Sequence, residues 1–270
     1  MDNGKAARIA LSFDDCRGDN YRVVREILEP MSIQATFNIT TGYVSGELDQ
    51  SNLPCKNEPL SIEEVQYIYA NPIFEIAGHG FAHKNSLVDW THGINDLKQW
   101  LGEEWCSGGI GVASPHCGIT QNGIEQITKE LDNLKINYIR IGLKNQKQLI
   151  QRVISKAARD TGNKFLFILP IRSTLRQAVC KKTMHSVPVL HQHTMKQMRY
   201  LIEYVMEQRD DCVLQIHSVL KRDEPFYDDM FSIDFDMFEK FIKWLNDLRN
   251  KNKIKIDRCI DLYNQSGGDR

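Results

Sequence analysis

The sequence predicts an α/β protein built as a distorted barrel of about seven or eight strand-helix units, TIM-barrel-like in layout. Short apolar runs alternate with helical patterns, which is typical of parallel strands with helices outside. No linker or composition break divides the 270 residues, and no dinucleotide-type glycine fingerprint favours an open doubly wound sheet. We expect one domain over residues 1–263 and a flexible tail over residues 264–270.

The predicted strands are short apolar runs bounded by polar residues. The first, residues 9–13, ends abruptly in two adjacent carboxylates, Asp14 and Asp15. The other strands are expected at residues 35–39, 74–77, 110–113, 138–143, 165–169, 187–190, 213–217 and 254–262. Parallel strands place their carboxyl ends at one face, so the polar residues that follow these runs are expected to converge there.

The predicted helices show a 3.6-residue apolar spacing and begin at capping residues. Asp19 or Asn20 can cap the first helix, and residues 61–64 and 194–197 form capping boxes at the start of two others. Further helices are expected at residues 88–105, from residue 120, at 145–159 and at 234–248. The polar segment 41–59 is predicted to be a long loop.

Charge and composition argue against several classes of partner. The formal net charge is -1, without a long block of one sign, which argues against binding to nucleic acid or to an anionic membrane. No apolar run is long enough to span a bilayer, and no signal peptide is visible, so we expect a cytoplasmic protein. No protein partner is predicted.

The seven cysteines also fit a reducing compartment. Their number is odd, their spacing is scattered and no CxxC pair occurs. These features argue against a disulfide framework or a cysteine-rich zinc site, so we expect reduced thiols.

Two histidines stand four residues apart, His79 and His83, directly after a predicted strand. If this segment turns helically, both rings lie on one face and can bind one metal ion. A carboxylate from the acid pair as third ligand would leave a position open for water, as in catalytic zinc sites. The alternative is that the histidines are unrelated surface residues and the acids a helix cap and a surface acid.

A third histidine, His217, ends the predicted strand VLQIH and shares a face with Val213 and Gln215. This alternation points its side chain into the barrel or at its mouth. The alternative is a neutral core histidine whose hydrogen bonds are satisfied.

Five segments, taken in order, resemble the motifs of one family. LSFDDC is similar to TFDDG, ATFNI to ATFFV, GHGFAH to H-(S/T)-x-x-H, SPHCG to RPPYG, and LQIH to LxH. They extend over roughly residues 6–262. The sequence therefore resembles the NodB-type polysaccharide deacetylases, carbohydrate esterase family 4.

The resemblance implies a role for each motif residue. Asp14 would be the general base and His217 the general acid. Asp15, His79 and His83 would hold a divalent metal ion, with zinc favoured and cobalt or nickel as alternatives. That ion would polarise the acetyl carbonyl and activate water.

The SPHCG segment corresponds to the substrate motif of the family. It contributes Ser114, Pro115 and Cys117. By the resemblance, the backbone N–H of Cys117 would hold the tetrahedral oxyanion together with the metal ion.

The sequence departs from the family at three positions. Cys16 replaces a glycine, and Gly80 replaces the usual Ser or Thr. Ser114 replaces the arginine that supports the base, so Asp14 is expected to lose a nearby cation and to have a higher pKa than in relatives. Arg140 or Arg172 could supply the charge from another element.

The resemblance implies a metal-dependent hydrolase that removes an N-acetyl group from an amino sugar in a glycan or glycan precursor. The same carbonyl chemistry would serve an O-deacetylase or an amidohydrolase acting on a non-sugar amide. A weakly active metal-binding homologue is a third interpretation, which the missing motif arginine favours.

Overall fold

The computed structural model describes residues 6–52, 57–143, 162–176, 178–227 and 230–266. Its strands are β1 (Ala7–Phe13), β2 (Ala35–Ile39), β3 (Phe74–Gly78), β4 (Ile110–Ala113), β5 (Ile136–Ile141), β6 (Val179–Cys180), β7 (Thr183–His185), β8 (Val187–Pro188), β9 (Asp211–Ile216), β10 (Ser218–Leu220), β11 (Ser232–Asp234) and β12 (Ile254–Asp257).

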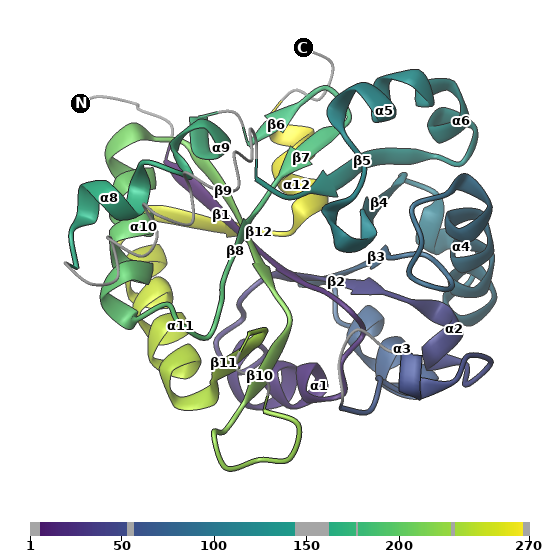
Figure 1. Cartoon of the computed structure of the whole chain (residues 1–270), viewed down its shortest axis with the longest axis horizontal. Coiled ribbons are helices and arrows are strands. Elements are labelled where there is room, and N and C mark those ends of the chain that lie inside the picture. Colours follow the sequence, from purple (N-terminus) through teal and green to yellow (C-terminus); the bar gives the residue numbers. More distant parts are fainter. Residues whose placement is uncertain (1–5, 53–56, 144–161, 177, 228–229, 267–270) are drawn as a thin grey trace.

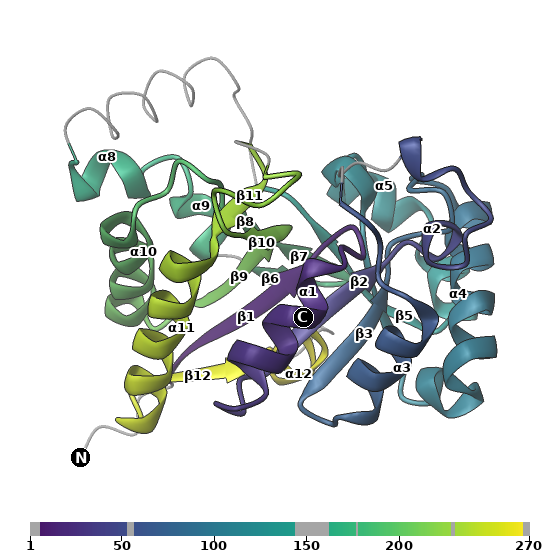
Figure 2. The ribbon, with the colours of Figure 1, turned by 90° about the horizontal axis from the view of Figure 1, so that it is seen from below.

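The helices are α1 (Asp19–Val23), α2 (Thr41–Val44), α3 (Ile62–Ala70), α4 (Leu87–Leu101), α5 (Gln121–Gln126), α6 (Thr128–Asn133), α8 (Lys164–Ile168), α9 (Arg172–Arg176), α10 (Met195–Gln208), α11 (Phe235–Asn250) and α12 (Cys259–Gln265). They lie around the strands, with α10 and α11 on one side and α3 and α4 on the other (Figures 1 and 2). The predicted α/β class is confirmed. None of the described helices is both long and apolar enough to cross a membrane.

One sheet carries most of the strands, in the order β6, β7, β5, β4, β3, β2, β1, β9, β8, and β12 also pairs with β1. All of these pairs are parallel except β6 with β7. The sequential order of β1 to β5 is that of a strand-helix barrel. Among the described strands no ladder joins β8 to β6, so backbone hydrogen bonds do not close the ring.

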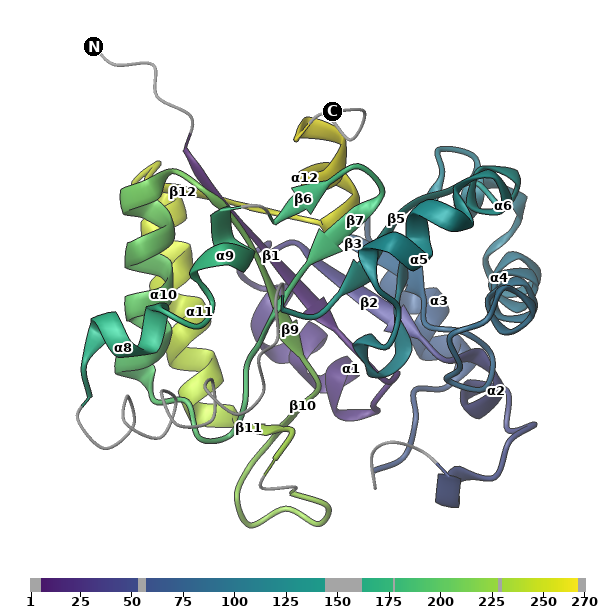
Figure 3. The same cartoon turned by 45° about the horizontal axis from the view of Figure 1, so that its top comes forward.

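Strand β1 is the centre of the sheet because it pairs with three neighbours. Its residues 8–13 pair with β9, residues 7–10 with β12, and Ser12 and Phe13 with β2. All seven of its residues are buried. The Phe13 ring stacks on Phe37 of β2 at 5.0 Å and meets Phe238 of α11 edge-on at 6.1 Å. Beyond β9, β10 and β11 form a separate parallel pair, which Figure 3 shows past the end of β9.

The two predicted capping boxes are confirmed. Ser61 accepts a hydrogen bond from the Glu64 backbone and Glu64 accepts one from the Ser61 backbone, and Thr194 and Gln197 do the same at α10. The predicted cap of the first helix is wrong, because Asp19 lies inside α1 and its carboxylate accepts the backbone N–H of Val219 instead.

The strand predicted at residues 165–169 is wrong, since this segment forms helix α8. The Asn163 side chain accepts hydrogen bonds from the backbone N–H groups of Phe165 and Leu166 and so begins a helix. A short apolar run suits a strand or a helix equally. In this run only Ile168 is buried, whereas Phe165 is 65% exposed, as on the surface of an amphipathic helix.

The C-terminal strand is shorter than predicted. It ends at Asp257, and α12 follows and runs through Gln265, two residues into the predicted tail.

Two other segments differ from their predictions. The predicted loop at 41–59 contains α2 and a 3₁₀ turn at Gln50–Asn52, and the helix predicted from residue 120 breaks at Ile127 into α5 and α6. The predicted helix 145–159 lies outside the described residues, as does Cys55. No disulfide joins any two of the six cysteines that the structure describes.

A buried carboxylate attaches α12 to the amino-terminal half of the sheet. Glu75 of β3 accepts hydrogen bonds from the Thr36 hydroxyl at 2.7 Å, the Tyr138 hydroxyl at 2.9 Å and the backbone N–H of Ile260 at 3.0 Å. Burial raises the pKa of Glu75, although these donors oppose the shift. The carboxylate therefore occupies the N-terminus of α12, where a negative charge is favourable.

Replacing Glu75 with Ala is expected to lower the free energy of unfolding by about 3 kcal/mol, because it leaves two buried hydroxyl donors and one partly buried N–H without an acceptor. Urea denaturation would measure the loss. Glu26→Ala, at an exposed position of the same residue type, serves as the control and should change stability by less than about 0.5 kcal/mol. Equal midpoints for the two variants would contradict the role given to Glu75.

Candidate metal centre and active site

The polar residues that follow the strands lie at one end of the sheet. Asp14 and Asp15 follow β1, His79 follows β3, Ser114 follows β4 and His217 follows β9. These strands are parallel neighbours, so their carboxyl ends meet. Side chains from distant parts of the chain therefore share one site.

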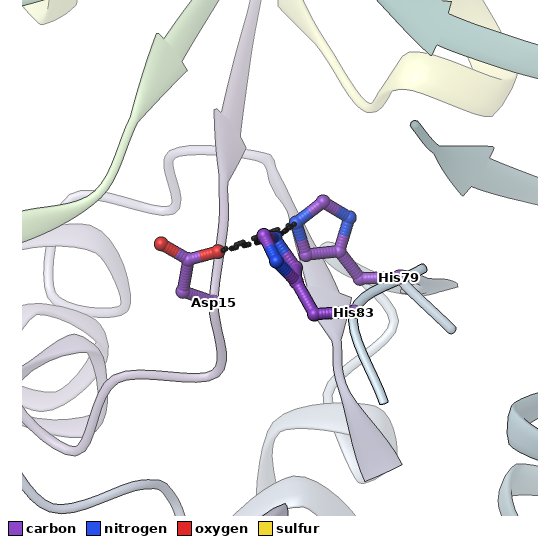
Figure 4. Close-up of side chains that lie close together, drawn as sticks. All are labelled: Asp15, His79 and His83. Carbon is purple, nitrogen blue, oxygen red and sulfur yellow. Dashed lines mark hydrogen bonds and ion pairs between the residues drawn. The ribbon is translucent and has the colours of Figure 1, made fainter. Parts of the chain in front are cut away.

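Asp15, His79 and His83 converge on one point (Figure 4). The Nε2 atoms of His79 and His83 lie 3.3 and 3.2 Å from Oδ1 of Asp15, and 3.1 Å from each other. All three side chains are buried. The structure thus brings together the three residues predicted as metal ligands.

The segment between the histidines is not the helical turn that the spacing suggested. His83 has a left-handed backbone (φ 57°), as does Gly80 (φ 83°). The Asp89 carboxylate fixes this loop by accepting the backbone N–H groups of Ala82 and Lys84. A Cβ at Gly80 would meet Asp89 Oδ2 at 2.1 Å, which explains why neither Ser nor Thr stands there.

The donor set fits a divalent cation. Ligand bonds of about 2.0–2.1 Å around a tetrahedral ion place neighbouring ligand atoms roughly 3.3 Å apart, close to the three separations found here. The Nδ1 atom of His79 lies 2.8 Å from the Ala113 carbonyl, so a proton on Nδ1 leaves the Nε2 lone pair facing the site. Two imidazole nitrogens and a carboxylate are the ligands that zinc prefers.

The pKa shifts agree with a carboxylate that stays ionised. Burial acts to raise the pKa of Asp15, but hydrogen bonds from His79 and His83 hold it well below its usual range. Burial lowers the pKa of His83, which favours the neutral ring that a metal ligand requires. The pKa of His79 is raised, because Asp15 and Asp14 outweigh the effect of its burial.

Asp14 is held by a set of hydrogen-bond donors that does not include His79 or His83. Nη2 of Arg140 lies 2.6 and 2.5 Å from its two carboxylate oxygens. The Asn38 amide donates to Oδ1 at 2.8 Å and the Gln215 amide to Oδ2 at 2.9 Å. The carboxylate is therefore fixed from three strands, β2, β5 and β9.

The expected loss of a cation beside Asp14 is wrong. Burial acts to raise the pKa of Asp14, but the charge of Arg140, and then those of His79 and His217, lower it overall. Arg140 is fully buried in β5 and supplies the cation beside Asp14. Arg172 lies exposed on α9 and lines a separate surface hollow with Lys164.

His217 lies between β9 and β10, beside the base candidate. Its Nε2 atom is 3.9 Å from Oδ2 of Asp14, and its ring packs on Phe231 with centroids 4.9 Å apart. Its Nδ1 atom is buried and has no hydrogen-bond partner among the described residues. Burial lowers the pKa of His217, although the charges of Asp15 and Asp14 oppose the shift.

The SPHCG segment, which the resemblance assigns to substrate binding, forms a tight turn at the edge of the site. The Ser114 hydroxyl donates to Oδ1 of Asn85 at 2.7 Å, and the Pro115 carbonyl accepts from the Asn85 amide. The backbone N–H of Cys117, predicted to hold the oxyanion, donates to the Ser114 carbonyl at 2.9 Å. The N–H of Cys117 must therefore break its hydrogen bond to the Ser114 carbonyl before it can donate to a substrate oxygen.

These groups surround one cavity of about 570 Å³. It is lined by Asp14, Asp15, Arg17, His79, His83, His116, Cys117, Gly142, Leu143, Pro188, Leu190, Gln215, His217, Met230 and Phe231. A lining that combines charged and polar side chains with apolar ones is typical of a small-molecule site.

Three residues of the site were missed in the sequence. Asn38 is one of two polar residues in an otherwise apolar strand, and Gln215 shares the strand face of His217, so both carried a visible signal. Arg17 is buried beside Asp15 and had no signal beyond its closeness to the acid pair.

Comparison with known proteins agrees with this geometry. Residues 2–106 match the family model described as polysaccharide deacetylase. A search of curated protein sequences finds no match. The chain resembles the crystal structure of a protein from Mycobacterium smegmatis that is assigned to the polysaccharide deacetylases, with TM-score 0.55 and 13% identity over 98% of this chain and 91% of that one.

Two further solved structures are more distant. The T48 deacetylase with substrate aligns over 96% of this chain and 92% of that one, with TM-score 0.40 and 13% identity. A mutant of a CE4 family pseudoenzyme with restored enzymatic activity aligns over 96% of this chain and 68% of that one, with TM-score 0.44 and 12% identity. The fold assignment rests on the Mycobacterium protein alone.

The family model covers the segment that holds β1, β2, β3 and α4, and with them Asp14, Asp15, His79 and His83. The structural match extends over nearly the whole chain. The resemblance to the NodB-type polysaccharide deacetylases is therefore confirmed, in the sequence of residues 2–106 and in the fold of the whole described chain.

Proposed function

We propose that this protein is a metal-dependent hydrolase that removes an N-acetyl group from an amino sugar in a glycan or glycan precursor. The family match and the fold support deacetylase activity in general. The observation that carries the finer proposal is the convergence of Asp15, His79 and His83 within 3.3 Å of one another, beside the separate carboxylate of Asp14. A cytoplasmic location stays a prediction from the sequence.

Asp15, His79 and His83 would hold the metal ion, with zinc favoured by the ligand types. When bound, a divalent ion supplies Lewis-acid chemistry, by polarising a carbonyl and lowering the pKa of a water molecule. The hydrogen bond from His79 to the Ala113 carbonyl keeps the imidazole in the orientation and tautomer that this binding requires.

Asp14 would accept the proton of the attacking water. Its lowered pKa keeps it ionised at neutral pH, so the base form needs no prior deprotonation. The donors on Arg140, Asn38 and Gln215 fix its orientation, which limits the reorganisation needed during proton transfer. The same donors weaken its basicity, because they stabilise the charged form.

His217 would protonate the leaving amine. Its burial favours the neutral ring in the free protein. The acid role therefore requires that His217 gain a proton during the reaction, and its nearness to Asp14, at 3.9 Å, places a source of that proton beside it. Nδ1 has no hydrogen-bond partner in the part of the chain that the structure describes, so this ring nitrogen can hold a proton while Nε2 meets the substrate.

The metal site can be tested by composition. After dialysis against a weak chelator, elemental analysis of the wild-type protein is expected to find bound zinc. His79→Ala removes one ligand and is expected to weaken zinc binding by at least about 100-fold. His191→Ala, at an exposed histidine outside the site, is the matched control and should retain the metal. Equal zinc content in the two variants would refute the site.

Activity can be tested by acetate release from a panel of N- and O-acetylated sugars, with metal-stripped protein as a blank. We expect release from N-acetylated sugars, and a loss of about 10² to 10⁴ in kcat for Asp14→Asn with unchanged metal content. Release from O-acetyl substrates alone would favour the O-deacetylase. Metal binding without release from any substrate would favour a non-catalytic homologue.

The two arginine candidates can be separated by mutation. Arg140→Ala leaves the buried Asp14 without its cation, so we expect kcat/KM to fall by about 10- to 100-fold and stability by about 3 kcal/mol. Arg172→Ala should change neither quantity, because Arg172 is exposed on α9. Arg140→Lys, which keeps the charge, should retain more activity than the Ala variant. Loss of activity in Arg172→Ala alone would contradict the assignment.

A further inference from the structure

A buried guanidinium lies on the side of Asp15 opposite the histidines. Arg17 is 1% exposed, and its Nη2 atom lies 3.2 Å from Oδ2 of Asp15. Oδ1 of the same carboxylate faces His79 and His83. The two oxygens of Asp15 are thus divided, one toward the candidate ion and one toward the arginine.

The arginine is itself held in place. Its Nη1 atom donates to the Ser218 hydroxyl at 2.8 Å. The Ser218 hydroxyl donates to Oδ1 of Asp19 at 3.1 Å, and Oδ2 of Asp19 accepts the backbone N–H of Val219 at 2.6 Å. A continuous hydrogen-bonded chain therefore connects Asp15 through Arg17 and Ser218 to the first residue of α1.

The backbone on both sides of Arg17 is also fixed. The Gly18 N–H donates to the Glu58 carbonyl at 2.7 Å, and the Leu60 N–H donates to the Cys16 carbonyl at 2.7 Å. A Cβ at Gly18 would meet the Glu58 oxygen at 2.9 Å, so only glycine allows this close approach. The guanidinium therefore reaches Asp15 from a backbone with little freedom to move.

We infer that Arg17 is a positioning residue for the metal centre, which fixes Asp15 so that only Oδ1 faces the ion. This inference rests on the proposed metal site. A carboxylate with a free second oxygen can rotate or bind an ion through both oxygens. The planar fork of Arg17 holds Oδ2 on one nitrogen and Ser218 on the other, which a lysine cannot reproduce in the same geometry.

The charge of Arg17 does not have to repel the ion strongly, because it is balanced locally. Asp15 lies on one side of the guanidinium, and Asp19 is joined to it through Ser218 on the other. The orienting hydrogen bond is therefore expected to outweigh the repulsion between the two cations. Removing the arginine should weaken metal binding, whereas a purely repulsive role would strengthen it.

The test compares zinc affinity, measured by competition with a chromophoric chelator, in wild type, Arg17→Met, Arg17→Lys and Ser218→Ala. We expect Arg17→Met to bind zinc about 10- to 100-fold more weakly, Arg17→Lys to recover part of this loss, and Ser218→Ala to show a smaller loss in the same direction. Arg25→Met, at an exposed arginine that pairs with Glu29, is the control and should bind as wild type does.

A spectroscopic readout separates orientation from a general loss of stability. In the cobalt-substituted protein, a freed Oδ2 would raise the coordination number, so the visible absorption of Arg17→Met should be weaker than that of wild type. Affinity equal to or tighter than wild type in Arg17→Met, or an unchanged cobalt spectrum, overturns the inference.

Should Arg17→Met fail to fold, unchanged affinity in both Arg17→Lys and Ser218→Ala would overturn the inference as well. Absence of zinc binding in the wild type would instead overturn the proposed metal site itself, and the role of Arg17 with it.

Discussion

Two neighbouring carboxylates are buried at the end of β1, and each needs its own compensation. Transfer of an ionised carboxylate from water into a protein interior costs several kcal/mol unless a counter-charge and hydrogen bonds replace the solvent. Asp14 meets Arg140 and two amides, whereas Asp15 meets two imidazoles and Arg17. Asp15 also has a left-handed backbone (φ 69°), so the chain turns between the two acids and the following residues. The site thus contains two clusters of charged and polar side chains, one around Asp14 and one around Asp15, and these two acids are adjacent in the chain.

This division gives the two acids different chemistry although they are adjacent in sequence. The partners of Asp14 are side chains of the protein, Arg140, Asn38 and Gln215, so its charge and orientation do not depend on a bound ion. Asp15 faces two nitrogens whose lone pairs need a proton or a cation between them. The negative charge of one adjacent carboxylate would otherwise raise the pKa of the other strongly. Arg140 beside Asp14 and Arg17 beside Asp15 oppose this shift. This difference fits the proposed roles, in which Asp14 accepts a proton and Asp15 binds a metal ion.

The sequence predicted the positions of the strand ends better than it predicted the contacts between them. Short apolar runs followed by Asp14, His79 and His217 are local signals, and parallel strands bring such ends together without further information. The left-handed turn at His83 was not predictable from spacing, because it depends on Asp89, a residue of the next helix. The run at residues 165–169 was misread because its pattern lacks a period and Asn163 decides the outcome.

The contacts of Arg140 and Arg17 are a second example of what the sequence does not predict. Arg140 was one of two candidates, and only the packing of β5 against the site separates it from Arg172. Arg17 could not be assigned, since a charged residue in a loop is normally exposed to solvent. Its burial depends on Ser218, which is 201 positions away along the chain. Contacts of this range are set by the whole fold and leave no local pattern.

The hydrogen bond between Glu75 and Ile260 also has a consequence for biosynthesis. The two residues are 185 positions apart, so during translation the Glu75 carboxylate lacks its hydrogen bond from Ile260 until most of the chain has been made. Strand β1 likewise gains its neighbour β12 only near the end of synthesis. The amino-terminal segment carries the three candidate metal ligands, but it cannot complete its own hydrophobic interior before the carboxyl-terminal strand and helix have been made. Nascent chains of this protein are therefore expected to expose apolar surface of β1 and β3 until β12 and α12 have emerged.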